Sequence, residues 1–304
     1  MENSTILNQV ITLFLIMALG FFLKKRGTIT DTVNKKLSEI LVDVTNPLLI
    51  ISSFQFAFSS EKLMNAGVVA LFALGLHFIL ILSGVFIYRK YPLKTRQVLQ
   101  FITIYANCGY MGFPLLQSIF GKEGIFYASI YVLVFNLYMW TNGVAIFTGK
   151  GNMKDLWKHL INPNILAVLV GMVFFLFSFK LPLPLFKAVD MVGSMTAPIS
   201  MLIIGALLAG MDFRKALTGS AIYFGSIMRL VASPLIAIAA VRLLGLSGLA
   251  IGVCVVLSGM PAAANTAIMA EMYDGDSVFA SRRVAISTLL SIITIPVVIT
   301  LLHT

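Results

Sequence analysis

Long runs of apolar residues constrain this chain more than any other feature of its sequence. A helix needs about 20 mostly apolar residues to cross the hydrocarbon core of a membrane. The strands of a membrane barrel would be shorter and would alternate between apolar and polar residues. We therefore predict an all-α membrane protein with ten transmembrane helices, numbered spans 1 to 10. They cover residues 6–23, 37–59, 65–87, 97–121, 124–148, 162–181, 187–210, 218–243, 248–272 and 277–302.

Composition supports this class and argues against several others. Of the 304 residues, 59% are hydrophobic and 11% are charged, whereas an ordinary soluble domain carries about 25% charged residues. A soluble enzyme, a disordered chain and a nucleic-acid-binding protein are therefore excluded. Both cysteines lie in apolar stretches, so we expect no disulfide framework, no metal cluster and no cofactor.

The distribution of basic residues predicts the orientation in the membrane. Sixteen Lys and Arg residues fall in the loops after spans 1, 3, 5, 7 and 9, and five fall in the loops on the other side. Loops rich in Lys and Arg face the cytoplasm, which fits the net charge of +10. We therefore expect a multi-pass protein of the cell membrane with both termini on the extracytoplasmic side. The first apolar run precedes its basic residues and is interpreted as a span, not as a signal peptide.

The chain contains an internal repeat of five spans. The Asn46-Pro47 pair of span 2 corresponds to Pro198 of span 7 at an offset of about 151 residues, and His77 corresponds to Arg229 at nearly the same offset. The copies cover residues 1–148 and 162–304. Because five is odd, the second copy must cross the membrane in the opposite sense. Inverted repeats of this kind are typical of secondary transporters, which bind substrate near the membrane midplane. Chance similarity between apolar helices is the alternative.

Spans 4 and 9 each carry a cluster of glycine, proline and asparagine near the middle. Proline removes a backbone donor and glycine loosens the helix, so residues 107–114 and 258–266 are predicted to unwind. The half-helices that begin after the breaks would direct free N–H groups toward one place, which suits an anion. Ordinary kinked helices are the alternative. The predicted substrate-binding residues are Asn107, Gly109, Tyr110, Gly112, Pro114, Pro261, Ala262 and Asn265.

Ionisable residues inside the spans are further candidates, because charge within a membrane is costly. Arg229 can neutralise a substrate carboxylate, hold a helix break or pair with an acid. His77 is a candidate for proton coupling, although a packing role is favoured. Asp43 of span 2 is a third candidate for coupling or charge compensation. The acidic residues 271–276, with Arg282 and Arg283, are interpreted as a solvated cytoplasmic loop.

Several short motifs in a fixed order give the chain a family resemblance. They are Thr45-Asn46-Pro47-Leu48-Leu49, residues 107–114, Asn162-Pro163-Asn164-Ile165, and Pro261 with Asn265. Together they make the whole chain resemble the bacterial branch of the auxin efflux carrier family.

The resemblance implies a fold akin to that of bile-acid sodium symporters. Spans 1, 2, 6 and 7 would form a scaffold with breaks at Asn46, Pro47 and Pro198, and this scaffold would make a homodimer contact. Spans 3–5 and 8–10 would form a moving transport domain. Spans 4 and 9 would cross at Pro114 and Pro261, and Asn107 and Asn265 would bind a carboxylate. Access would alternate by an elevator-like movement.

The predicted function is therefore secondary transport of a small carboxylate such as malate, malonate or an auxin-like acid. A proton or sodium ion is the possible coupling ion, and the motifs do not select among the acids. A sodium-coupled symporter of the bile-acid type, a membrane receptor and a channel are the alternatives. An intramembrane enzyme is disfavoured, since the sequence has no H-E-x-x-H motif and no pair of intramembrane aspartates.

Overall fold

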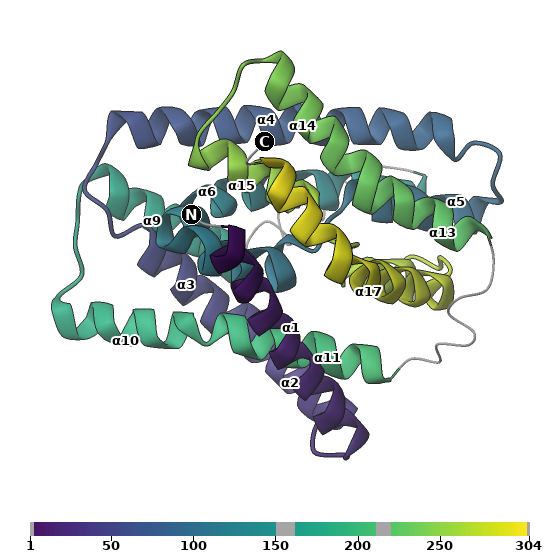
Figure 1. Ribbon diagram of the computed structural model, residues 1–304, viewed down its shortest axis with the longest axis horizontal. Helices are drawn as coiled ribbons and strands as arrows, with labels where there is room; N and C mark the ends of the chain where they lie inside the picture. Colours follow the sequence, from purple (N-terminus) through teal and green to yellow (C-terminus); the bar gives the residue numbers. More distant parts are fainter. Residues whose placement is uncertain (1–2, 150–161, 211–219, 303–304) are drawn as a thin grey trace. The chain divides into compact units, whose positions relative to one another are not determined.

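The computed structural model describes residues 3–149, 162–210 and 220–302, and these residues form helices without any strand (Figure 1). Helices occur in each of the ten predicted ranges. The first half contains α1 (Asn3–Lys25), α2 (Asp31–Ile40), η1 (Leu41–Thr45), α3 (Asn46–Ser53), α4 (Ser60–Ile87), α5 (Leu93–Ile104), η2 (Cys108–Gly112), α6 (Phe113–Tyr138), η3 (Met139–Gly143) and α7 (Val144–Thr148). The second half contains α9 (Pro163–Leu176), α10 (Leu183–Ser194), α11 (Thr196–Ala209), α13 (Ser220–Ile227), η4 (Met228–Ala232), α14 (Ser233–Leu243), α15 (Leu249–Ser258), α16 (Thr266–Met272) and α17 (Ser277–Leu302). The η elements are single π-helical turns.

Six helical segments among the described residues are long and apolar enough to cross a membrane. They are Asn8–Lys25, Ser60–Ile87, Cys108–Thr148, Leu183–Ala209, Tyr223–Leu243 and Ser277–Leu302, and α9 and α15 are shorter apolar helices. The long segment Cys108–Thr148 is interrupted at Gly121 (φ 60°, ψ −149°), where span 4 was predicted to end. The all-α membrane class is thus confirmed, while the count of ten spans and the inverted repeat stay predictions.

Internal contacts divide the chain into two compact units. Unit 1 comprises residues 1–69, 109–133 and 161–210, and unit 2 comprises residues 70–108, 134–160 and 211–304. Spans 1, 2, 6 and 7 contribute to unit 1 and spans 8–10 to unit 2, whereas spans 3–5 are divided between them. The scaffold and transport domains expected from the family resemblance stay predictions.

In unit 1, α1 and α11 cross each other in backbone contact (Figure 1). A Cβ atom at Gly20 would lie 2.7 Å from the Cα atom of Leu202, and one at Gly205 would overlap the carbonyl oxygen of Met17. Small residues let membrane helices approach this closely, which maximises van der Waals contact where no hydrophobic force drives association. The two glycines therefore set the spacing of α1 and α11.

The predicted scaffold breaks are helix junctions in which the chain keeps helical dihedral angles. Thr45 (φ −72°, ψ −41°) joins η1 to α3, so Asn46 and Pro47 begin a helix. Met195 (φ −68°, ψ −15°) joins α10 to α11, and Pro198 lies in the first turn of α11. Proline fits the helical φ angle and is tolerated best in the first turn of a helix. The helices change their hydrogen-bond pattern at these points and do not unwind.

Replacing Gly205 by alanine should lower the stability of the protein. The new methyl group would meet backbone atoms of α1, which can yield only if the two helices separate. Overpacking of this kind costs about 1–3 kcal/mol, and we expect a lower midpoint of thermal unfolding in detergent. Gly67→Ala is the matched control, because nothing lies within 4 Å of a Cβ at exposed Gly67. Equal midpoints for the two variants would contradict this account of the contact.

Candidate functional site

The interrupted parts of spans 4 and 9 pair with each other inside unit 2. Ala106 and Ala262 form an antiparallel bridge. The N–H of Asn107 donates to the carbonyl of Pro261 at 2.7 Å, and the N–H of Ala263 donates to the carbonyl of Tyr105 at 3.0 Å. We call residues 105–107 and 259–265 the crossover. The backbone pairing within the crossover replaces helical hydrogen bonds that both of its segments lose at this point.

The two segments of the crossover, residues 105–107 and 259–265, leave the helical conformation for different reasons. After α15, the crossover contains Gly259 and Pro261, and proline has no N–H to continue a helix. After α5, residues 105–107 contain neither glycine nor proline, and the chain becomes extended at Tyr105 (φ −101°, ψ 112°). Pairing with span 9 therefore decides where span 4 breaks. Pro114 is the second residue of α6, a position that tolerates proline, and a crossing at Pro114 stays a prediction.

Arg229 connects both broken helices to a third one. The residue lies in the π-helical turn η4 and is 1% exposed. Its Nε donates to the carbonyl of Met260 at 3.0 Å, and its Nη1 donates to that of Thr103 at 2.9 Å. Its Nη2 donates to the carbonyl of Ser258, the last residue of α15. The last carbonyls of a helix have no helical partner, so Arg229 caps the C-terminal ends of α5 and α15 together.

Removing the guanidinium of Arg229 should severely destabilise the protein. Arg229→Met would leave several buried carbonyl groups without donors, and each orphaned group costs about 1–3 kcal/mol. Arg229→Lys should fall between wild type and Arg229→Met, because an ammonium group cannot span the same carbonyls as a planar fork. Thermal unfolding in detergent measures the effect, with Arg242→Met on the exposed end of α14 as the control. A midpoint for Arg229→Met equal to that of the control would contradict the capping role.

The chain between the crossover bridge and α16 carries unused backbone donors. The N–H of Ala262 donates to Ser287 Oγ at 3.1 Å, and that of Thr266 donates to the carbonyl of Ala263 at 3.0 Å. Within the described residues, the N–H groups of Ala264 and Asn265 find no acceptor. Both residues are half-buried. Two adjacent N–H groups without an acceptor can bind the oxygens of an anion.

The structure unites only part of the predicted substrate site. Asn107, Pro261 and Ala262 meet in the crossover, and Asn265 precedes α16 in the same unit. The other four predicted residues belong to unit 1, where Gly109, Tyr110 and Gly112 form η2 and Pro114 starts α6. Tyr110 packs there against a buried cluster of Leu41, Ile199 and Ile203.

His77 has the surroundings of a packing residue. It is 1% exposed, and its Nδ1 lies 2.7 Å from the carbonyl oxygen of Ala73. Its ring stacks on that of Tyr138 with centroids 5.4 Å apart and an interplanar angle of 7°. A carbonyl oxygen can only accept, so Nδ1 is the protonated nitrogen. These contacts favour the packing role over proton coupling.

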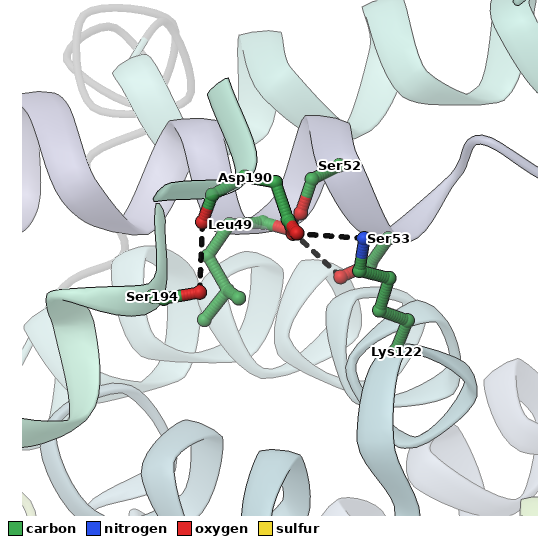
Figure 2. A network of polar contacts seen from close by, with 6 residues as sticks. All are labelled: Leu49, Ser52, Ser53, Lys122, Asp190 and Ser194. Atoms are coloured by element: carbon green, nitrogen blue, oxygen red, sulfur yellow. Dashed lines mark hydrogen bonds and ion pairs between the residues drawn. The ribbon is translucent and has the colours of Figure 1, made fainter. Parts of the chain in front are cut away.

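The acidic residues of unit 1 lie at exposed or ion-paired positions. Asp43 is exposed in η1, and Glu39 pairs with Lys36 at 2.7 Å. Asp190 of α10 pairs with Lys122 of α6 at 2.8 Å, as Figure 2 shows, and its carbonyl accepts from Ser194 Oγ. The Lys122–Asp190 pair was not predicted, because its partners lie far apart in the sequence.

One sequence-based interpretation is wrong. Glu271 and Asp274 are exposed, as expected for a solvated loop. Arg283, however, lies inside α17 and is 0% exposed. The helix begins at Ser277, and its first turns pack into unit 2, so the side chain turns away from water.

Comparison with known proteins identifies the family. Residues 5–299 match the family described as "Membrane transport protein". This chain belongs to the membrane transport protein family. The match covers nearly the whole chain and confirms the resemblance to auxin efflux carriers. The protein is therefore a transporter with several membrane helices.

The individual relatives are distant, and two of the three described here match over nearly the full length of both chains. A protein of Methanocaldococcus jannaschii named "Uncharacterized transporter" is 25% identical over 299 residues, which cover 95% of this chain and 96% of the relative. One of Methanothermobacter thermautotrophicus with the same description is 26% identical over 94% of this chain and 95% of its own. A Rhizobium meliloti protein named "Putative malonate transporter" is 25% identical over 64% of this chain and 63% of its own.

Proposed function

We propose that this protein is a secondary transporter of a small organic anion, and that the anion binds at the crossover. The observation that carries the proposal is the pair of unused N–H groups at Ala264 and Asn265. Such donors are fixed by the backbone and need no reorganisation when a carboxylate arrives. The name of the Rhizobium meliloti relative supports malonate as the first acid to test, and malate and auxin-like acids belong to the same class.

Electrostatics around the crossover supports an anion over a cation. Arg229 brings a positive charge to the ends of α5 and α15, where it donates hydrogen bonds to carbonyl groups. Charge interactions are strong in an interior of low dielectric constant. The N–H groups of Ala264 and Asn265 add partial positive charge. A carboxylate at Ala264 and Asn265 would thus be stabilised mainly by these N–H donors, in a unit that also contains the cationic side chain of Arg229.

The transport cycle that we propose follows the expected ten-span inverted repeat. Spans 3–5 and 8–10 would move as one domain and carry the crossover between the two sides of the membrane, in an elevator-type cycle. The bonds of Arg229 support such a domain, because they join α5, α15 and η4 into one rigid body. Spans 1, 2, 6 and 7 would form the static scaffold and a homodimer contact. A proton or sodium ion would drive the cycle, and both termini would lie outside the cytoplasm.

A proline at position 265 tests the proposed anion site at the level of the backbone. Asn265 has φ −66°, which proline can adopt, so Asn265→Pro removes the N–H and the side chain. Asn265→Ala is the matched control, because it removes only the side chain. A hydrogen bond to a charged group contributes about 1.5–3 kcal/mol. We therefore expect Asn265→Pro to raise the half-saturating malonate concentration at least about tenfold relative to Asn265→Ala.

The measurement is uptake of radiolabelled malonate into liposomes that contain the purified protein, with malate and an auxin-like acid as competitors. Folding of each variant is checked by its thermal unfolding midpoint. Saturable uptake supports a carrier. Uptake that stays linear at high concentration would indicate a channel, and binding without uptake would indicate a receptor. Equal half-saturating concentrations for Asn265→Pro and Asn265→Ala would place the anion elsewhere.

A further inference from the structure

Unit 2 contains another buried guanidinium, which differs from that of Arg229 because it has no hydrogen-bond partner among the described residues. Arg283 of α17 is 0% exposed. Its Nε, Nη1 and Nη2 atoms are buried and find no acceptor anywhere in the described part of the chain. Arg229 is equally buried, but each of its nitrogens donates to a carbonyl group. The two arginines therefore have different roles.

The described neighbours of Arg283 are apolar side chains, backbone and the tyrosines Tyr88 and Tyr91, and none of these is a carboxylate. Its Cζ lies 5.7 Å from the ring centroid of Phe279, one turn earlier on α17. The guanidinium packs directly on the backbone of Gly225 in α13, so closely that a Cβ there would overlap Nη2 and lie 3.2 Å from Cζ. The same Cβ would lie 2.7 Å from the side chain of Leu99 in α5. Helices α5, α13 and α17 thus surround the group, and its donors stay unused.

An unpartnered guanidinium in such a place is costly. Burying a charged group without a compensating partner is strongly unfavourable, and ionisable groups within membrane proteins commonly mark paths of ions and substrates. The guanidinium offers a planar fork of donors, and this fork matches the paired oxygens of a carboxylate or phosphate. An anion can supply the partner that the described part of the chain does not give to Arg283.

We propose that Arg283 binds the paired oxygens of an anionic group, at a second anion site in unit 2. The carboxylate of the transported acid can supply these oxygens, in which case the inference rests on the proposed function. The phosphate of a lipid headgroup offers the same chemistry. Which source is used is decided by the experiment below.

The second site lies close to the crossover and is distinct from it. Ser287, which accepts from the N–H of Ala262, is one helical turn after Arg283, or about 6 Å along the axis of α17. Side chains on a helix lean toward its N-terminus, so the guanidinium of Arg283 lies on the side away from Ser287. An acid bound at Arg283 would thus occupy a different position from an acid bound at Ala264 and Asn265.

The test compares Arg283→Gln with Arg282→Gln, which removes the same charge from the half-buried neighbouring residue. The protein is kept in an uncharged detergent, and its thermal unfolding midpoint is measured at increasing malonate concentrations, since a bound ligand stabilises the folded state. We expect the half-saturating malonate concentration to rise at least tenfold in Arg283→Gln and to stay within twofold of wild type in Arg282→Gln. This result would support Arg283 as a site for the acid.

A second arm tests the lipid source. The same proteins are placed in nanodiscs of phosphatidylcholine with or without phosphatidylglycerol. If phosphatidylglycerol raises the midpoint of wild type and of Arg282→Gln but not of Arg283→Gln, the site is supported and the lipid is its ligand. Responses of Arg283→Gln equal to those of wild type toward both malonate and phosphatidylglycerol would overturn the inference.

A third variant separates ligand binding from a structural role. Arg283→Met keeps the bulk of the side chain, and without any anion it should unfold no earlier than Arg282→Gln, because no hydrogen bond is lost. A much lower midpoint, or failure to fold, would show that Arg283 has a partner within the protein and would overturn the inference.

Malonate uptake that is unchanged in Arg283→Gln refutes the role of Arg283 for the acid but leaves the proposed function intact. Absence of malonate uptake in wild type refutes the proposed function. The nanodisc experiment with phosphatidylglycerol then decides whether Arg283 binds an anion.

Discussion

The hydrogen bonds of Arg229 are the interaction on which the rest of unit 2 depends. Two helices stop in the apolar interior, and irregular backbone is tolerated there only if its polar groups find partners. Arg229 supplies donors to the carbonyl ends of α5 and α15 at once. A single buried cation therefore stabilises both breaks, together with the antiparallel bridge between Ala106 and Ala262.

The same bonds decide the sign of the charge that the crossover can attract. Arg229 and the bridge satisfy carbonyl oxygens, which are acceptors, whereas the N–H groups of Ala264 and Asn265 keep no partner within the described residues. The described part of this region thus has more N–H donors than acceptors for them. This excess of donors supports the proposed anion, and side chains around the donors would set the size and shape of the acid that fits.

Sequence reasoning located the break of span 9 because its cause is local, namely Gly259 and Pro261. It misplaced the break of span 4 because residues 105–107 carry no glycine or proline, and their extended conformation is stabilised by partners more than 150 residues away. Glycine and proline at 109–114 lie instead in η2 and the first turn of α6. Local composition predicts a break only where the chain itself causes it.

The sequence by itself determined the all-α membrane class, since long apolar runs can satisfy their backbone in lipid only as helices. Its motifs also identified a transporter family. Only the tertiary structure decided what each buried arginine does. Arg229 and Arg283 are the same residue type in apolar helices, but one faces the open ends of two helices and the other faces Gly225 and Phe279. The hydrogen-bond partners of a buried arginine lie on other helices. Which of them it reaches depends on how the helices pack, and the sequence around the arginine does not specify this.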